Sequence, residues 1–137
     1  MIPRIYIDTS VVGGFFDEEF EMATKLLFQQ HKNKEIIFVI SDLLRDELKP
    51  APQHIKIFLM IMMKVFFENV VSTEISDSLA QKYVDEKVVG KTSFDDCRHI
   101  AITTINKVDV LASWNFKHIV NLNRIKGYNA VNLKNGY

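Results

Sequence analysis

Apolar runs of strand length alternate along the chain with longer segments in which apolar residues recur at helical spacing. Residues 4–8 (RIYID) are β-branched and aromatic, and residues 35–41 (EIIFVIS) form a continuous apolar run. A continuous run of this length is typical of a parallel strand that is covered on both faces. The other predicted strands are residues 69–75, 109–113 and 129–133, and the predicted helices are residues 24–32, 42–49, 52–67, 77–89, 94–106 and 115–122.

This alternation predicts an α/β fold, a three-layer α/β/α sandwich with a central, mainly parallel sheet. Residues 11–20 (VVGGFFDEEF) are predicted to form a loop. Ser41, Ser76 and Ser93 are the expected N-caps of the helices that follow them. Because no repeat, low-complexity tract or linker interrupts the pattern, we expect residues 1–137 to form a single domain.

Composition narrows the class of protein. The 137-residue chain is 47% hydrophobic with a formal net charge of zero, so it can bury one sizeable core and has no general basic field for nucleic acid. The single cysteine, Cys97, excludes an internal disulfide. No signal peptide is visible, and we expect a cytoplasmic protein. Lys56 and Lys64 interrupt the apolar run 54–67, which predicts a buried core helix and no membrane span.

Three acidic residues lie where successive elements begin or end. Asp8 directly follows the first predicted strand, Glu47 lies on the short helix after the second, and Asp96 opens the helix before the fourth. Ligands of parallel sheets bind beyond the carboxyl ends of the strands, so we expect these carboxylates to share one edge. Their repulsion would be relieved by a cation, and oxygen ligands without cysteine suit Mg²⁺ or Mn²⁺. Such a site supports hydrolysis of a phosphodiester by a metal-activated water.

Four short motifs, in this order, resemble those of the PIN-domain nucleases, and among them the VapC-type toxins of bacterial and archaeal toxin–antitoxin systems. They are YIDTS (residues 6–10), SDLLRDEL (41–48), DDCRHIA (95–101) and LASWNFKHI (111–119), and together they span nearly the whole chain. The resemblance places the three acids of that family on Asp8, Glu47 and Asp96. At the fourth position the family commonly has Thr or Ser, a variable residue and then Asp, whereas here Asn115 stands in place of the acid.

The resemblance implies a metal-dependent endoribonuclease with RNA as substrate, Mg²⁺ or Mn²⁺ as cofactor, a homodimer and neutralisation by a cognate antitoxin. The implied catalytic residues are Asp8, Glu47, Asp96 and Asn115, of which the first three would bind the metal. The supporting residues are Thr9, Ser113 and Asp95. If RNA binds at this edge, Trp114 would stack on a base and Lys117 and His118 would contact phosphate.

Several of these residues also have a purely structural interpretation. Asp8 fits ordinary turn chemistry, and Asp96 in a first helical turn is favoured by the helix macrodipole. Asn115 is a good N-cap for the segment that follows it. Trp114 is equally suited to covering the core. His99 is interpreted as a packed core residue rather than a general base.

Two other classes of protein would need acidic residues that this sequence does not have at the corresponding positions. A response-regulator receiver would need an acid pair after the first strand, and a haloacid-dehalogenase-like phosphatase would need a second Asp where Ser10 stands; both are disfavoured. The main alternative is a PIN-like domain that has lost cleavage and keeps RNA or partner binding, with Asn115 as its indication. The apolar segment around residues 57–67 fits either core burial or a self-association surface.

Overall fold

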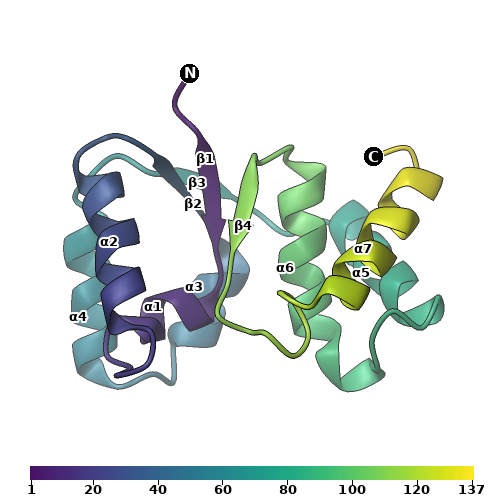
Figure 1. Ribbon diagram of the computed structural model, residues 1–137, viewed down its shortest axis with the longest axis horizontal. Coiled ribbons are helices and arrows are strands. Elements are labelled where there is room, and N and C mark those ends of the chain that lie inside the picture. The colour runs from purple at the N-terminus through teal and green to yellow at the C-terminus, as the bar shows by residue number, and fades with distance from the viewer.

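The computed structural model describes residues 1–137 except for the side chain of Thr92. The strands are β1 (Arg4–Ile7), β2 (Ile37–Ser41), β3 (Glu68–Val70) and β4 (Val110–Ala112). The helices are α1 (Thr9–Gly14), α2 (Glu21–Lys32), α3 (Asp42–Leu48), α4 (Gln53–Met62), α5 (Glu74–Asp85), the 3₁₀ helix η1 (Lys91–Ser93), α6 (Phe94–Ile105) and α7 (Leu122–Lys134) (Figure 1).

The strands pair in parallel in the order β3-β2-β1-β4. Successive side chains of a strand point to opposite faces of the sheet. In β1, Ile5 and Ile7 accordingly belong to one buried cluster and Tyr6 to another. All three are at most 8% exposed, which is why this segment is apolar without alternation.

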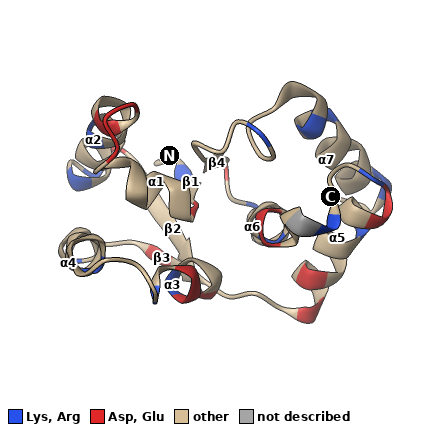
Figure 2. Cartoon of the chain, turned by 90° about the horizontal axis from the view of Figure 1, so that it is seen from below, with Lys and Arg blue, Asp and Glu red and all other residues tan. Residues whose placement is uncertain are grey.

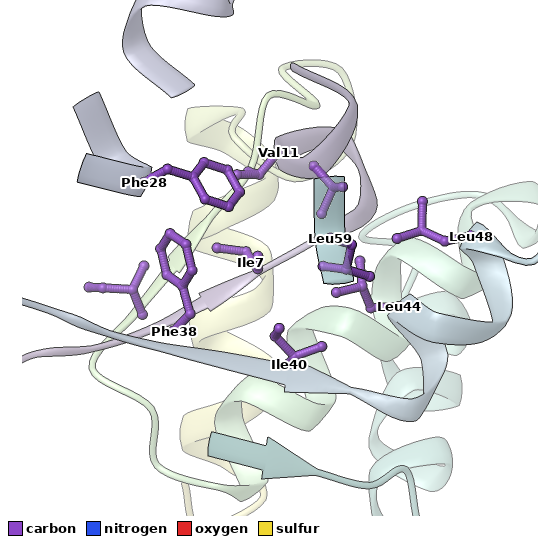
Figure 3. Close-up of a cluster of buried hydrophobic side chains, with 10 residues drawn as sticks. Ile7, Val11, Phe28, Phe38, Ile40, Leu44, Leu48 and Leu59 are labelled. Carbon is purple, nitrogen blue, oxygen red and sulfur yellow. The ribbon is translucent and has the colours of Figure 1, made fainter. Parts of the chain in front are cut away.

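Two groups of helices cover the two faces of the sheet. On one face, buried side chains of α1, α2, α3 and α4 pack on the sheet and include Phe28 and Leu59 (Figure 3). On the other face, Tyr6 packs with Ile102 of α6, and α6 packs in turn against α5 and α7. Figure 1 shows α2 and α4 on one side of the strands and α5, α6 and α7 on the other. The predicted α/β/α sandwich with a central parallel sheet is confirmed.

The first helix lies in a segment that we predict to be a loop. Residues 15–20 are turns, as predicted, but α1 occupies residues 9–14. The side chain of Asp8 caps α1 by accepting a hydrogen bond from Val11 N, and Val11 and Val12 are fully buried. Capping and burial together outweigh the low helix propensity of Gly13 and Gly14, so the loop prediction is wrong for α1.

The helix predicted at residues 77–89 begins at Glu74 instead. Thr73 is its N-cap: Ser76 N donates to Thr73 Oγ1 at 3.1 Å, and Thr73 N donates to Ser76 Oγ at 2.8 Å. This reciprocal pair is a capping box, in which the third helical residue completes the cap. The predicted N-cap role of Ser76 is therefore wrong, and the strand predicted at residues 69–75 ends at Val70.

The C-terminal region differs most from the prediction. Residues 116–119 form turns where a helix over 115–122 is predicted, and the predicted strand at 129–133 lies within α7. Tyr128 and Val131, three residues apart, are both buried in the cluster formed with α5 and α6. That spacing suits one face of a helix, and the sheet ends at β4.

Among the described residues, no helix combines the length and the apolar character needed to cross a bilayer. The apolar run 54–67 contains most of α4, in which Leu59 is buried whereas Met60 and Ile61 are 68% and 55% exposed. The prediction of a core helix is therefore confirmed for one face of α4 only.

Candidate functional site

The carboxyl ends of β1 and β2 lead to two of the three predicted acids. Asp8 directly follows β1, and Glu47 lies on α3, which follows β2. Asp96 lies in the first turn of α6. Acidic residues at the end of β1, on α3 and at the start of α6 surround the same region of the molecule in Figure 2. The topology thus brings acids from three separate segments to one edge of the sheet.

Asp8 is only 4% exposed, and hydrogen bonds engage both of its carboxylate oxygens. Oδ1 accepts from Ser10 Oγ at 2.6 Å and from Val11 N at 3.2 Å, and Oδ2 accepts from Ser113 Oγ at 2.6 Å. Asp8 is therefore the N-cap of α1 and also connects the ends of β1 and β4. Because an ionised carboxylate has about four acceptor positions, these three bonds fix its orientation and leave capacity for a further ligand.

Glu47 receives two hydrogen bonds on one oxygen. Thr9 Oγ1 donates to Glu47 Oε1 at 3.0 Å, and His99 Nε2 donates to the same atom. Burial raises the pKa of Glu47, but the hydrogen bonds from His99 and Thr9 and the charges of His99 and Arg98 outweigh burial and hold the pKa below its usual value. Glu47 is thus ionised at neutral pH. Oε2 accepts no hydrogen bond from the described part of the chain.

Asp96 is half-buried and electrostatically coupled to the other two acids. Burial raises the pKa of its carboxyl, the charges of His118 and His99 lower it, and the charges of Asp8 and Glu47 raise it, so that the pKa lies above its usual value. Coulombic effects of this kind require proximity. The hydrogen bonds agree with this proximity, because Thr9, next to Asp8, and His99, one turn after Asp96 on α6, both donate to Glu47.

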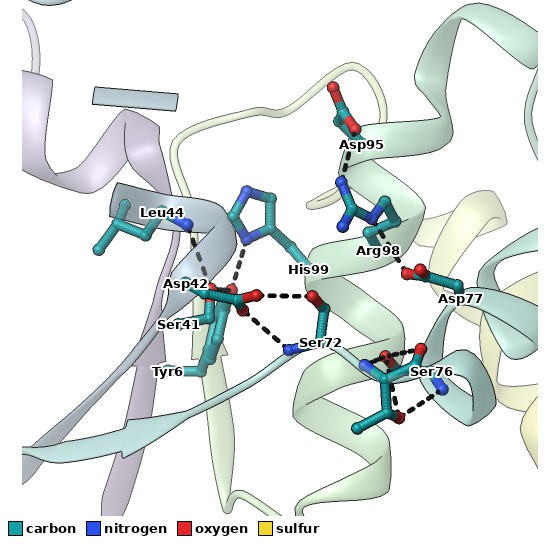
Figure 4. Close-up of polar contacts among 11 residues, drawn as sticks. Tyr6, Ser41, Asp42, Leu44, Ser72, Ser76, Asp77, Asp95, Arg98 and His99 are labelled. Carbon is teal, nitrogen blue, oxygen red and sulfur yellow. Dashed lines mark hydrogen bonds and ion pairs between the residues drawn. The ribbon is translucent and has the colours of Figure 1, made fainter. Parts of the chain in front are cut away.

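Asp95, the neighbour of Asp96, has a different environment. Its side chain is 64% exposed, and its carboxylate lies 3.4 Å from Arg98 Nη1. Arg98 Nε also donates to Asp77 at 3.1 Å (Figure 4). Asp95 thus belongs to an exposed ion-pair group. Ser93 occupies the N-cap position of α6, but its buried hydroxyl makes no hydrogen bond with any described group, so the predicted side-chain cap is not formed.

The segment after β4 contains two predicted site residues, Ser113 and Asn115, and their side chains have different partners. Ser113 Oγ donates to Asp8, and it accepts from Asn115 N at 3.0 Å. Asn115 Oδ1 accepts from His118 N at 3.0 Å, so Asn115 caps the turn at residues 116–119. Of the predicted supporting residues, Thr9 and Ser113 hydrogen-bond to site carboxylates. The side-chain oxygen of Asn115 therefore acts as a cap, which is the structural alternative to a role in the site.

The three predicted RNA-binding residues have different surroundings. Trp114 Nε1 donates to Thr24 Oγ1 at 3.0 Å, and its ring is parallel to that of Phe20 with the centroids 5.5 Å apart. Trp114 therefore covers the core, the second of its two interpretations. Lys117 is exposed. The charge of His118 lowers the pKa of Asp96, so the two side chains lie near each other. Nδ1 of His118 is buried without a hydrogen bond to any described residue.

The interpretation of His99 as a core residue is confirmed, but the sequence pattern does not predict its contact with a site carboxylate. His99 is 2% exposed, which agrees with a core residue, yet Nε2 donates to Glu47. Its Nδ1 lies 2.5 Å from Tyr6 OH, a contact that Figure 4 shows. Its spacing contains a usable signal. His99 lies three residues after Asp96 on a helix, and Tyr6 lies two residues before Asp8 on a strand, so each pair shares a face.

The chemistry of these donors fits a hard divalent cation. Glu47 Oε2 and the Asp96 carboxylate accept no hydrogen bond from the described residues, and both are oxygen ligands beside a third carboxylate. Mg²⁺ typically binds one or two protein carboxylates and retains several waters. In the described part of the chain, no three His, Cys, Asp or Glu side chains are gathered closely enough to enclose an ion. The donor types therefore suit Mg²⁺ or Mn²⁺ without forming a complete protein cage.

Comparison with known proteins adds no assignment. No protein-family model matches the sequence, and no curated protein matches it. The resemblance to PIN-domain nucleases therefore depends on the four motifs, and the candidate site depends on the geometry described above.

Proposed function

We propose that this protein is a Mg²⁺- or Mn²⁺-dependent endoribonuclease of the PIN type, acting in the cytoplasm as the toxin of a toxin–antitoxin pair. The observation that carries the proposal is geometric: Thr9, next to Asp8, and His99, one turn after Asp96 on α6, both donate to Glu47 Oε1 at the edge of a parallel sheet. Burial and the charges of two neighbouring carboxylates disfavour ionisation of a third carboxyl group. A divalent cation bound among the three relieves the repulsion between their charges. The four sequence motifs supply the family and RNA as the substrate.

The residues of the site would have distinct roles in this reaction. Asp96 and Glu47 would bind the cation through oxygens that accept no hydrogen bond from the described residues, and Asp8 would supply a further oxygen in a fixed orientation. When bound, the cation supplies an oriented, activated water and neutralises charge on the phosphoryl oxygens. Lys117, exposed after β4, and His118, near Asp96, would contact RNA phosphates.

The decisive experiment is cleavage of a mixed RNA pool with Mg²⁺, with Mn²⁺ and with a chelator. The unmodified protein is expected to cut only when a metal is present. Asp8→Asn and Asp96→Asn preserve side-chain size, and Asn at position 8 remains a good N-cap. Because each removes a carboxylate from the site, we expect cleavage to fall by about 10²-fold or more.

Asp95→Asn is the matched control for Asp96→Asn. It removes the same charge from the same helical turn, but Asp95 is exposed and paired with Arg98. We expect Asp95→Asn to cut RNA at the unmodified rate. Cleavage that persists in the chelator, or that is unaffected by both Asp8→Asn and Asp96→Asn in folded protein, would contradict the proposal.

A second candidate function is a catalytically weak or inactive PIN-like module that binds RNA or protein. The observation that favours it is Asn115, which replaces the fourth acid of the family and uses Oδ1 to cap a turn. Such a module would bind RNA without cutting it. Fluorescence anisotropy with labelled RNA, alongside the cleavage assay, distinguishes the two functions.

The proposal also includes a homodimer and a cognate antitoxin. Exposed apolar side chains on and after α4, among them Met60, Ile61 and Phe66, give the protein a surface for such contacts. Sedimentation equilibrium of the purified protein measures its mass directly, and we expect twice the mass of one chain.

A further inference from the structure

A buried series of hydrogen bonds ends at Glu47. Ser41 Oγ lies 2.7 Å from Tyr6 OH, Tyr6 OH lies 2.5 Å from His99 Nδ1, and His99 Nε2 donates to Glu47 Oε1. Figure 4 shows Ser41, Tyr6 and His99 meeting between the sheet and α6. Each of these three side chains is at most 2% exposed. The series therefore connects β2, β1 and α6 to the carboxylate on α3.

Packing alone does not account for these polar groups. Burying a hydroxyl or an imidazole is costly unless it is hydrogen-bonded, and apolar side chains would fill the same space without that requirement. Here both ring nitrogens of His99 and the hydroxyl of Tyr6 have partners. Ser41 also accepts a hydrogen bond from Leu44 N at 3.2 Å. A fully satisfied buried network of this kind holds its members in one orientation.

The orientation of Glu47 is what this network determines. His99 and Thr9 both donate to Oε1, which leaves Oε2 without a hydrogen bond from the described residues. Hydrogen bonds to one part of a ligating group commonly orient the atom that binds the metal. The two carboxylate oxygens of Glu47 therefore differ: Oε1 is held by hydrogen bonds within the protein, and Oε2 is available to a ligand.

We infer that His99 is a positioning residue for Glu47: it holds Oε1 so that Oε2 binds the divalent cation, while Tyr6 and Ser41 hold the imidazole in place. This inference rests on the proposed function, because it takes Glu47 as a metal ligand. It adds three residues that lie outside the set of acids and that do not touch the cation or the RNA.

The test measures Mn²⁺ affinity by titration calorimetry, with RNA cleavage measured separately. His99→Leu removes both ring nitrogens, whereas His99→Gln retains an amide N–H that can donate to Glu47 from near the position of Nε2. We expect His99→Leu to weaken Mn²⁺ binding about 10–100-fold, as loss of a residue that orients a ligand does. His99→Gln is expected to restore most of the affinity.

Tyr6→Phe tests the network without altering the site's charged groups or the volume of the core. It removes only the hydroxyl that contacts His99 Nδ1, and we expect a weaker but measurable loss of Mn²⁺ affinity. Tyr83→Phe is the matched control. Tyr83 is also 0% exposed, and its hydroxyl donates to Asn132, a residue of α7 outside the site. A role limited to fold stability would make the two Tyr→Phe variants behave alike.

Two outcomes overturn the inference, and they differ in meaning. If Asp96→Asn loses Mn²⁺ binding while His99→Leu and Tyr6→Phe bind as the unmodified protein does, the inference fails and the proposed function stands. If the unmodified protein does not bind Mn²⁺ at all, the proposed function fails and the inference fails with it. Should His99→Leu not fold, the comparison of Tyr6→Phe with Tyr83→Phe decides the question.

Discussion

In the first turn of α6, burial and the charges of Asp8 and Glu47 raise the pKa of Asp96, while His118 and His99 oppose this shift. The stability associated with a protonated Asp96 is fully present below the ordinary carboxyl pKa of 3.8 and is lost as the pH rises through the raised folded value. At pH 7 the ionised Asp96 carboxylate therefore destabilises the metal-free protein. A residue that weakens its own fold in this way is typical of a functional site.

Asp96→Asn is accordingly expected to stabilise the metal-free protein at pH 7. The expected gain in the free energy of unfolding is about 0.5–2 kcal/mol, the usual size of a single stabilising substitution. Urea denaturation in a chelating buffer measures it, and Asp95→Asn controls for the loss of an acid from the first turn of α6. The gain should shrink as the pH falls toward and below the ordinary carboxyl pKa of 3.8, because the Asp96 carboxyl then becomes protonated in both the folded and the unfolded protein. A lower unfolding free energy for Asp96→Asn than for Asp95→Asn at pH 7 would contradict this account.

At the scale of elements, local patterns predict the strands best. Continuous apolar runs identify β1 and β2, because strands buried on both faces have few polar positions. The segment 129–133 has no such constraint: Val131 favours a strand by propensity, but it packs with Tyr128 in a cluster that only the tertiary fold creates. α1 is missed for a related reason, since Gly13 and Gly14 disfavour a helix that capping by Asp8 and burial then stabilise.

The candidate site divides in the same way between predictable and unpredictable parts. Its acids can be predicted because strand ends and helix starts can be located in the sequence. The hydrogen bonds behind Glu47 cannot, since the contact between Tyr6 and His99 joins positions 93 residues apart. The spacing of these two residues from Asp8 and Asp96 indicates a shared face but not a shared contact. Only the placement of α6 across β1 brings the two side chains together. Periodicity indicates that His99 is buried, but it does not identify the partners of its ring nitrogens.

A close contact at the end of α1 determines how this helix packs. A Cβ atom at Gly14 would lie 2.6 Å from Trp114 Nε1 and 2.8 Å from Thr24 Oγ1, whereas a Cβ at Gly13 would meet no atom within 4 Å. We expect Gly14→Ala to lower the free energy of unfolding by about 1–3 kcal/mol through overpacking. Because α1 begins beside Asp8, its displacement should also reduce RNA cleavage.

Gly13→Ala is the matched control for Gly14→Ala. It makes the same chemical change one residue earlier in α1, and alanine favours a helix over glycine by roughly 0.5–1 kcal/mol. Urea denaturation of both variants is expected to show opposite signs, with Gly13→Ala neutral or stabilising. Equal destabilisation by the two substitutions would mean that the contact with Trp114 is not the cause.

At the scale of the whole molecule, the candidate site joins the two helical layers. Thr9 and Glu47 belong to α1 and α3 on one side of the sheet, whereas Asp96 and His99 belong to α6 on the other. The hydrogen bonds from Thr9 and His99 to Glu47 therefore connect both layers at the edge of the sheet. The site therefore forms only when the two helical layers pack correctly on the sheet. Because a substitution that lowers global stability can also lower activity, both should be measured for each variant.

A buried histidine far from the acids makes that global stability depend on pH. His31, in the last turn of α2, is 1% exposed, and its ring stacks on Phe38 of β2 with the centroids 4.2 Å apart. Its Nδ1 accepts a hydrogen bond from Phe38 N at 3.3 Å. Burial lowers the pKa of His31, and a hydrogen bond with the backbone of Ile36 opposes this only in part.

Because the folded pKa of His31 is depressed, its contribution to stability is present above the ordinary imidazole pKa of 6.5 and is lost as the pH falls through the folded value. His31→Asn keeps an acceptor for Phe38 N but cannot become protonated in this range. We expect it to cost about 0.5–3 kcal/mol at pH 8 through lost packing, as most core substitutions do.

Below pH 6.5 the unfolding free energy of His31→Asn should fall less steeply than that of the unmodified protein. Urea denaturation of both proteins at several pH values measures the two slopes, and since the other histidines are common to both, parallel slopes would show that His31 is not responsible.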